Sequence, residues 1–146
     1  MSTAKTNGSN EGSKGRALEL DALVIGAGFS GLYSLYKLRD EMGMKVRVYD
    51  AAAGGGGTWY WNLYPGARCD SESYYYSYSF SPELEQEWEW TSKYPEQPEI
   101  LSYLNHVADR FDLRRDIQLE TRIEQARYDE ARNRWQVRTD AGEEIS

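Results

Sequence analysis

Residues 22–50 read ALVIGAGFSGLYSLYKLRDEMGMKVRVYD, and this stretch decides the fold. It opens with Ala22 to Ile25, a short apolar run that suits a buried parallel strand. Gly26, Gly28 and Gly31 follow directly as a complete G-x-G-x-x-G. The first glycine permits a tight turn, the second lets the backbone approach a pyrophosphate, and the third lets the next helix pack closely on the strand. The pattern therefore predicts a phosphate site at a helix N-terminus.

The residues after the turn continue the same unit. Apolar residues recur at helical spacing over 32–42, and Gly43 is placed to end that helix. Lys45 to Asp50 is expected to form a second strand. Asp50 lies about 20 residues after the last glycine, where an acid at a strand end accepts hydrogen bonds from an adenosine ribose. The unit predicts dinucleotide binding, and the alternative is a tight strand-to-helix turn in a sheet that binds nothing.

Length and composition narrow the class of protein. A chain of 146 residues has room for one domain with a modest core but not for a two-domain enzyme. A net charge of -7 argues against nucleic acid or an anionic membrane as a partner. No apolar run approaches transmembrane length, and Met1 to Arg16 lacks the hydrophobic segment of a secretory signal. Cys69 is the single cysteine, which favours the cytoplasm, and one histidine without a cysteine cluster argues against a metal site.

The chain divides by composition into a tail and a folded part. Residues 1–20 are rich in serine, asparagine, glycine, threonine and lysine and nearly free of large apolar groups. Such a segment cannot offset the entropy cost of ordering, so we expect a flexible tail. Residues 21–146 are expected to fold.

A second glycine-rich stretch, Gly54 to Gly57, runs directly into the aromatic cluster Trp59, Tyr60 and Trp61. Glycines next to the end of a second strand would let backbone amides come close to a ligand, whereas the simpler interpretation is a flexible connector. The three aromatic residues favour the first interpretation, because they are too bulky and too close together for a solvated linker. They can instead form the wall for a planar ring system.

The turn Tyr64 to Asp70, with the sequence YPGARCD, carries an adjacent cation and anion. Arg68 and Asp70 could bind a phosphate and orient a ring, or they could form an ordinary surface ion pair. The residue types alone leave both interpretations open.

These three segments together resemble the N-terminal part of the flavin-dependent Baeyer–Villiger monooxygenases. The resemblance rests on the glycine fingerprint, on GGTWYWN at 56–62 and on YPGARCD at 64–70. Arg68-Cys69-Asp70, followed by YSFS at 78–81, is more similar to the phenylacetone and steroid monooxygenase branch than to the cyclohexanone branch. The resemblance extends from about Asp21 to Gly142.

The resemblance implies an α/β, Rossmann-like FAD-binding domain: a parallel sheet with helices and a β-hairpin insertion. It also implies that this domain is incomplete at its C-terminal end, because neither a further parallel strand nor an NADPH-binding domain with its own glycine fingerprint follows. The implied cofactor-binding residues fall into groups. They are Gly26, Gly28, Ser30 and Gly31 at the FAD pyrophosphate, Asp50 at the ribose, Thr58 and Trp59 along the flavin side, Asp70, Ser71 and Tyr76 at the flavin, Arg68, Cys69 and Asp70 at NADPH, and Ile123 near the adenine. Gly57 is implied as a further cofactor-binding residue.

This chain departs from the resemblance at two positions. Asp50 stands where the branch more often has a longer glutamate, which still fits an acid–ribose contact. Leu63 stands where the pattern usually has an arginine, so a salt bridge made there is absent.

The implied activity belongs to a longer protein. In it NADPH reduces FAD, O₂ adds to give a flavin peroxide, and the peroxide converts a ketone to an ester or lactone, with Asp70 as the catalytic residue of this segment. The remainder of the chain is required, and the segment alone is not expected to be active. The alternatives are an N- or S-oxygenating flavin monooxygenase, or a non-catalytic flavin-binding fragment if the chain ends at Ser146.

Three further elements are expected outside the motifs. Pro98 should open a packing helix, because proline suits the first helical turn. Ile117 to Tyr128 and Arg134 to Thr139 should form a β-hairpin. Tyr74 to Phe80 alternates partly and predicts either a strand or an extended active-site loop.

Overall fold

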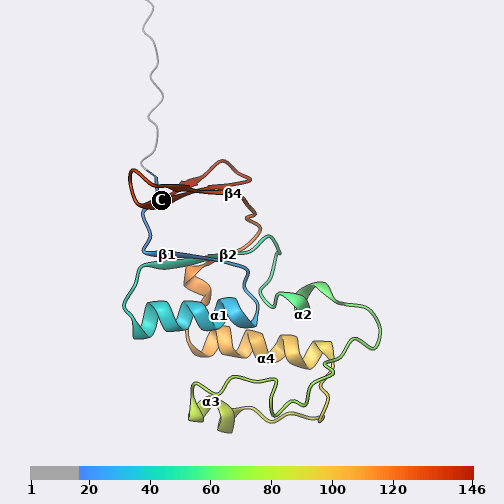
Figure 1. The fold of residues 1–146 in the computed structure, drawn as a ribbon. Coiled ribbons are helices and arrows are strands. Elements are labelled where there is room, and N and C mark those ends of the chain that lie inside the picture. Colours follow the sequence, from blue (N-terminus) through green and yellow to red (C-terminus); the bar gives the residue numbers. More distant parts are fainter. Residues whose placement is uncertain (1–16) are drawn as a thin grey trace, which may run out of the picture.

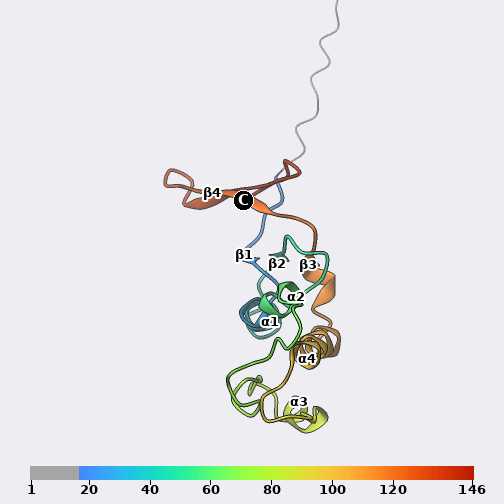
Figure 2. The same cartoon turned by 90° about the vertical axis from the view of Figure 1, so that its right-hand side faces the viewer.

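The computed structural model describes residues 17–146 as two sheets and a helical layer (Figure 1). A parallel sheet of order β1-β2-β3 lies between an antiparallel sheet of order β4-β5-β6 and the helices α1 and α4 (Figures 1 and 2). Most of the expected flexible tail, residues 1–16, lies outside the described residues. Leu18 and Leu20 run beside the last strand, since Leu18 N donates to Glu144 O at 3.2 Å and Leu20 N to Ser146 O at 3.0 Å. The folded part therefore begins before residue 21.

The predicted strand, turn, helix and second strand are confirmed. β1 (Ala22–Ile25) and β2 (Val46–Tyr49) are parallel, with Val24 opposite Val48. Between them α1 (Phe29–Tyr36) continues into a short π-helical turn, η1 (Lys37–Glu41). Gly43 has a φ of +68°, a value that favours glycine and ends the helical segment.

The remaining helices and strands follow in chain order. They are α2 (Thr58–Trp61), α3 (Pro82–Glu87), α4 (Gln97–Arg110), the 3-10 turn η2 (Arg114–Asp116), β3 (Ile117–Gln118), β4 (Ile123–Asp129), β5 (Arg134–Thr139) and β6 (Glu144–Ile145). The expected packing helix begins at Gln97, one residue before Pro98. Residues 74–80 form turns and bends rather than a strand.

The prediction of one continuous strand from Ile117 to Tyr128 is wrong. The chain instead makes β3, which pairs with β2 in the parallel sheet, and then β4, which pairs with β5 in the antiparallel sheet. The break occurs at Glu120, which has a φ of +50° and donates its N–H to Ala52 O at 2.9 Å. The hairpin of β4 and β5 itself is confirmed.

Two apolar clusters hold these layers together. The larger one lies between the parallel sheet, α1 and α4, and includes Leu35, Val48 and Leu104, all almost fully buried. The smaller one lies between the two sheets and is centred on Tyr49, Val137 and Ile145. Burial of apolar side chains on both faces of the parallel sheet fixes the position of the turn at its end.

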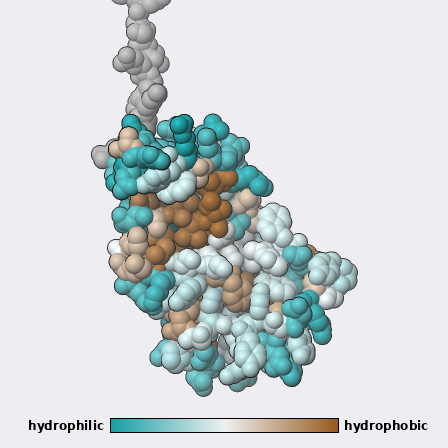
Figure 3. All heavy atoms as spheres, in the orientation of Figure 1, coloured by the Kyte–Doolittle hydropathy of each residue, from teal (hydrophilic) through white to brown (hydrophobic). Residues whose placement is uncertain are grey.

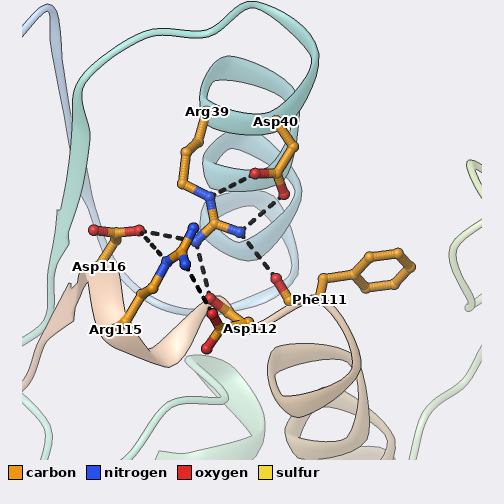
Figure 4. A network of polar contacts seen from close by, with 6 residues as sticks. All are labelled: Arg39, Asp40, Phe111, Asp112, Arg115 and Asp116. Carbon is orange, nitrogen blue, oxygen red and sulfur yellow. Dashed lines mark hydrogen bonds and ion pairs between the residues drawn. The ribbon is translucent and has the colours of Figure 1, made fainter.

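A polar network fastens η1, which continues α1, to the connection between α4 and β3 (Figure 4). The guanidinium of Arg39 donates to both carboxylate oxygens of Asp40, to Asp116 at 2.8 Å, and to the backbone carbonyls of Phe111 and Asp112, each at 2.9 Å. Arg115 pairs with Asp112 at 3.0 Å and with Asp116 at 3.3 Å. Arg39 is only 11% exposed at its side chain, so this cation is part of the packed structure.

Candidate functional site

The two glycine-rich segments meet at the end of the parallel sheet and form a pocket of about 330 Å³. The pocket lining includes many of the predicted cofactor-binding residues: Gly26, Gly28, Ser30, Gly31, Gly57, Thr58, Trp59 and Tyr76. Ile25, Phe29 and Gly56 complete it. Segments that lie about 30 residues apart in the chain are therefore brought to one place, as the sequence predicted.

The fingerprint turn has the geometry that its glycines require. Gly26 has a φ of +96°, which side chains rarely allow. A Cβ on Gly31 would lie 1.8 Å from the carbonyl oxygen of Gly26, so the helix could not pack this closely on the strand with any other residue. Gly28 caps α1 without a side-chain hydrogen bond, and the first turn of α1 carries no acidic residue. The N–H groups at this helix end are available to an anion.

The second glycine segment lies against the first. A Cβ on Gly28 would approach the Cα of Gly57 to 3.3 Å, and a Cβ on Gly57 would approach the Cα of Gly28 to 2.9 Å. Gly56 N donates to the carbonyl of Ala27 at 2.9 Å. The pocket is therefore lined by backbone from both segments, and side chains at the contact would separate them.

Asp50 lies behind this contact and is buried, with 6% of its surface exposed. Its Oδ2 accepts a hydrogen bond from Ala27 N at 2.6 Å, and its Oδ1 accepts one from Ala52 N at 2.8 Å. The carboxylate thus faces the fingerprint turn, whereas its predicted contact with a ribose stays a prediction.

One wall of the pocket is aromatic. Trp59 is buried, and its Nε1 donates to the hydroxyl of Tyr76 at 3.1 Å. The ring of Phe29 meets the ring of Tyr76 edge-on at 4.8 Å. Gln97, at the start of α4, donates its side-chain N–H to the carbonyl of Trp59 and so fixes α2 against α4. This wall offers planar apolar surface beside the backbone of the glycine segments.

Two buried tyrosines support the wall from behind. The hydroxyl of Tyr78 donates to the carbonyl of Phe29 at 2.6 Å, and Tyr78 N donates to the hydroxyl of Tyr103 at 2.9 Å. Burial raises the pKa of Tyr103 to about 12 and raises the pKa of Tyr78 still further above its usual value. Both hydroxyls therefore stay protonated and act as neutral structural groups.

Sequence reasoning missed four contributors to this site. Ile25 is the last residue of the predicted first strand, so its place at the turn followed from that strand. Phe29 occupies a variable position of the fingerprint, and Gly56 lies within the glycine run, so both were within reach of the motif argument. Gln97 carries no such signal, because its partner Trp59 is 38 residues away in the chain.

The other predicted residues do not line the pocket. Arg68 is exposed and pairs with Glu96 rather than with Asp70, and Asp70 is itself exposed. Cys69 is buried and donates its backbone N–H to Pro95 O at 3.0 Å, and its sulfur accepts from Ser71 N at 3.4 Å. Ile123 opens β4 and packs between the two sheets. The predicted cofactor contacts of these residues stay predictions.

The pocket fits a dinucleotide. A diphosphate is an anion that backbone N–H groups at a helix N-terminus can hold, and it needs the space that a Cβ on Gly28 or Gly57 would fill. The aromatic wall beside it suits a planar ring system. Over residues 17–146, none of the helices is both long and apolar enough to cross a membrane.

Comparison with known proteins finds a matching family and several similar monooxygenases. Residues 24–89 match the family described as "NAD(P)-binding Rossmann-like domain". The chain is 50% identical over 136 residues to a Baeyer–Villiger monooxygenase of Pseudooceanicola batsensis, an alignment that covers 93% of this chain and 25% of that protein. It is also 54% identical over 123 residues to the phenazine N-monooxygenase of Lysobacter antibioticus. This alignment covers 84% of this chain and 23% of that protein.

A solved structure gives the same result for the fold. An oxidised steroid monooxygenase bound to NADP superimposes with a TM-score of 0.85 and 61% sequence identity, covering 87% of this chain and 24% of that one. The chain spans about a quarter of the length of the relatives it matches.

Proposed function

We propose that this chain forms the FAD-binding segment of an NADPH- and O₂-dependent monooxygenase that converts ketones to esters or lactones. The premise is that the chain is homologous to the flavin-dependent monooxygenases of the Baeyer–Villiger type over the part of them that it spans. The observation that carries the proposal is the meeting of the two glycine segments at one pocket with an aromatic wall. When bound, FAD supplies the redox chemistry between NADPH, O₂ and the ketone.

The residues of this chain bind and orient the cofactor. The backbone of Gly26, Gly28 and Gly57 and the N-terminus of α1 hold the diphosphate. Trp59 and Tyr76, joined by their hydrogen bond, exclude water from one side of the pocket. Tyr78 holds the carbonyl of Phe29 and so keeps the start of α1 in place.

The proposal is tested on the protein at its native length. FAD should copurify or bind with quenching of flavin fluorescence, and NADPH consumption should depend on an added ketone and yield the ester. Absence of flavin binding would refute the proposal. Flavin binding without ester formation from any ketone would restrict it to cofactor binding, which is the outcome expected of a non-catalytic flavin-binding protein.

A second candidate reaction is N-oxygenation. Its support is the 54% identity with the phenazine N-monooxygenase over 123 residues, which is comparable to the 50% identity with the Baeyer–Villiger relative over 136 residues. Product analysis separates the two reactions, because a ketone yields an ester whereas a heteroaromatic amine yields an N-oxide.

Asp70 is our proposed catalytic residue within this segment. Its carboxylate is exposed, and it follows Cys69, whose backbone is held by Pro95. Asp70→Ala is expected to lower ketone oxidation far more than the FAD content of the protein. Unchanged turnover would remove Asp70 from the reaction.

The edge of the parallel sheet supports our proposal that residues 21–146 are one part of an FAD-binding domain. Within residues 17–146, β1 lies at the edge of the parallel sheet and pairs with β2 alone, and Ile25 at its end is 66% exposed. A groove of about 310 Å³ follows this edge and is lined by apolar residues including Leu23, Trp135 and Val137. Figure 3 shows the corresponding apolar patch between the two layers of the molecule. A further parallel strand would cover this edge, and an intact mass above 16.8 kDa for the native polypeptide would support its presence.

The partners follow from the same proposal. The small-molecule partners are a ketone, O₂ and NADPH, and the remainder of the polypeptide supplies the NADPH-binding part. We place the protein in the cytoplasm, and fractionation of the source cells with an antibody against residues 59–70 tests this location.

A further inference from the structure

Asp50 carries a buried carboxylate with both oxygens committed to backbone amides. Oδ2 accepts from Ala27, which lies inside the fingerprint turn, at 2.6 Å. Oδ1 accepts from Ala52, which leads into the second glycine segment, at 2.8 Å. One side chain therefore connects the two segments that line the pocket.

The peptide groups of Ala27 are held on both sides. Its N–H is bonded to Asp50, and its carbonyl accepts from Gly56 N at 2.9 Å. Ala27 is fully buried, so loss of the carboxylate would leave its N–H without an acceptor and away from water. The orientation of the turn is thus determined by groups of the chain itself.

We propose that Asp50 is a positioning residue whose carboxylate holds the fingerprint turn against the second glycine segment in the cofactor-free protein, so that the pocket is formed before a diphosphate enters. The inference rests on the proposed FAD-binding function and adds a role that differs from contact with a ribose, since the carboxylate acts on Ala27 rather than on the cofactor. A pocket that is already ordered binds more tightly because less conformational freedom is lost on binding.

The test compares Asp50→Ala and Asp50→Asn with the control Asp21→Ala. Asp21 is a matched control because its exposed carboxylate also accepts a backbone amide, Lys45 N at 2.7 Å, at the opposite end of the same pair of strands. Hydrogen exchange is measured in the FAD-free protein at its native length, on peptides covering residues 22–31, and the dissociation constant for FAD is measured by fluorescence quenching.

We expect Asp50→Ala to speed exchange in this peptide at least about tenfold and to weaken FAD binding by a similar factor, because a buried amide loses a charged acceptor. Asp50→Asn should give a smaller effect of the same kind, since its one side-chain oxygen can still accept one amide. Asparagine has nearly the size of aspartate, so this variant carries the test if Asp50→Ala does not fold. Asp21→Ala should change neither quantity.

Unchanged exchange in both Asp50 variants would overturn the positioning role. Weaker FAD binding with unchanged exchange would assign Asp50 to the ribose instead and leave the proposed function intact. Failure of the native protein to bind FAD would refute the proposed function, while the exchange data would still decide whether Asp50 holds the turn.

Discussion

Arg39→Met is expected to destabilise the protein by about 3 kcal/mol, because it removes a guanidinium that several groups share. Methionine keeps the aliphatic part of the side chain and loses only the charged end. The bonds to the carbonyls of Phe111 and Asp112 and to Asp116 are lost together. A hydrogen bond to a charged group contributes about 1.5–3 kcal/mol, and breaking a buried ion pair costs about 3–5 kcal/mol.

The total for Arg39 is smaller than the sum of these values. Asp116 is 27% exposed at its side chain, so water can replace part of what the carboxylate loses. Asp40 is the adjacent residue and 33% exposed, so its pair with Arg39 contributes little. Two carbonyl bonds and one partly solvated ion pair therefore give the figure of about 3 kcal/mol. The pKa of Arg39 is raised above its already high usual value, mainly by its hydrogen bond to Asp40, so the guanidinium is charged at every accessible pH. The destabilisation by Arg39→Met should therefore not change through deprotonation of Arg39.

Thermal unfolding followed by circular dichroism measures the loss. About 3 kcal/mol corresponds to a fall of roughly 10 °C for a domain of this size. Lys37→Met is the matched control, because Lys37 lies in the same helical turn and its ammonium makes an exposed ion pair with Glu41. A fall in melting temperature for Arg39→Met that is no larger than the fall for Lys37→Met would refute the structural role of this guanidinium.

Three further predictions concern the pocket and two ionisable contacts. Gly28→Ala should weaken FAD binding at least about tenfold, because its Cβ would lie 3.3 Å from the Cα of Gly57 and in the space for the phosphates. The control Gly55→Ala should bind FAD normally, because the nearest atom to its Cβ would be 3.5 Å away. Equal FAD affinities of the two variants would contradict this prediction. Burial raises the pKa of Tyr103 to about 12 from the usual 10.0, so its contribution to the free energy of unfolding is full below pH 10 and is lost as the pH rises toward 12. Tyr103→Phe should therefore reduce the dependence of stability on pH between 10 and 12, measured by alkaline unfolding. The hydrogen bond from Arg110 lowers the pKa of Glu87 below its usual 4.5, so this contact should stabilise the protein above pH 4.5 and lose its effect as the pH falls below that value. In Arg110→Gln, acid unfolding should lack the loss of stability that comes from protonating Glu87.

The parts of the fold that sequence predicted are those with short-range causes. The turn at Gly26, the close approach at Gly31 and the helix end at Gly43 each follow from steric demands within a few residues. The first strand follows from an apolar run and the second from the alternation of Val46 and Val48, and neither pattern depends on distant residues. For this reason the predicted strand, turn, helix and strand are confirmed with only small shifts at their ends.

The parts that sequence did not predict depend on partners far along the chain. The break after Gln118 arises because Glu120 and Thr121 donate to the carbonyls of Ala52 and Asp50, about 70 residues earlier. Leu18 belongs to the folded part only because β6 runs beside it. Local composition contains no trace of either contact. Apolar and polar residues largely alternate from Ile117 to Ile123, and one continuous strand is the simplest interpretation of that pattern.

The loop that carries Asp70 shows how backbone and side chains divide their roles. The backbone is fastened to residues 93–97, which lead into and begin α4, at three points: Gln97 N donates to Ala67 O at 2.8 Å, Cys69 N to Pro95 O at 3.0 Å, and Ser73 N to Lys93 O at 2.8 Å. Within this fixed loop the carboxylate of Asp70 is left exposed. An ordered backbone lowers the entropy cost when a side chain binds a ligand.

The same loop shows which partner Arg68 takes. An ordinary surface ion pair between Arg68 and Asp70 is not what forms, because Arg68 pairs with Glu96 across the bridge that joins the two segments. Arg68 thus helps to fasten the loop through Glu96, and its guanidinium does not pair with the carboxylate of Asp70. If Asp70 acts in the reaction, Arg68→Ala should impair it indirectly by loosening the loop, whereas Asp70→Ala should impair it without altering the exchange rates of the amides of residues 67–73. Equal exchange changes in the two variants would show that both residues serve only to hold the loop.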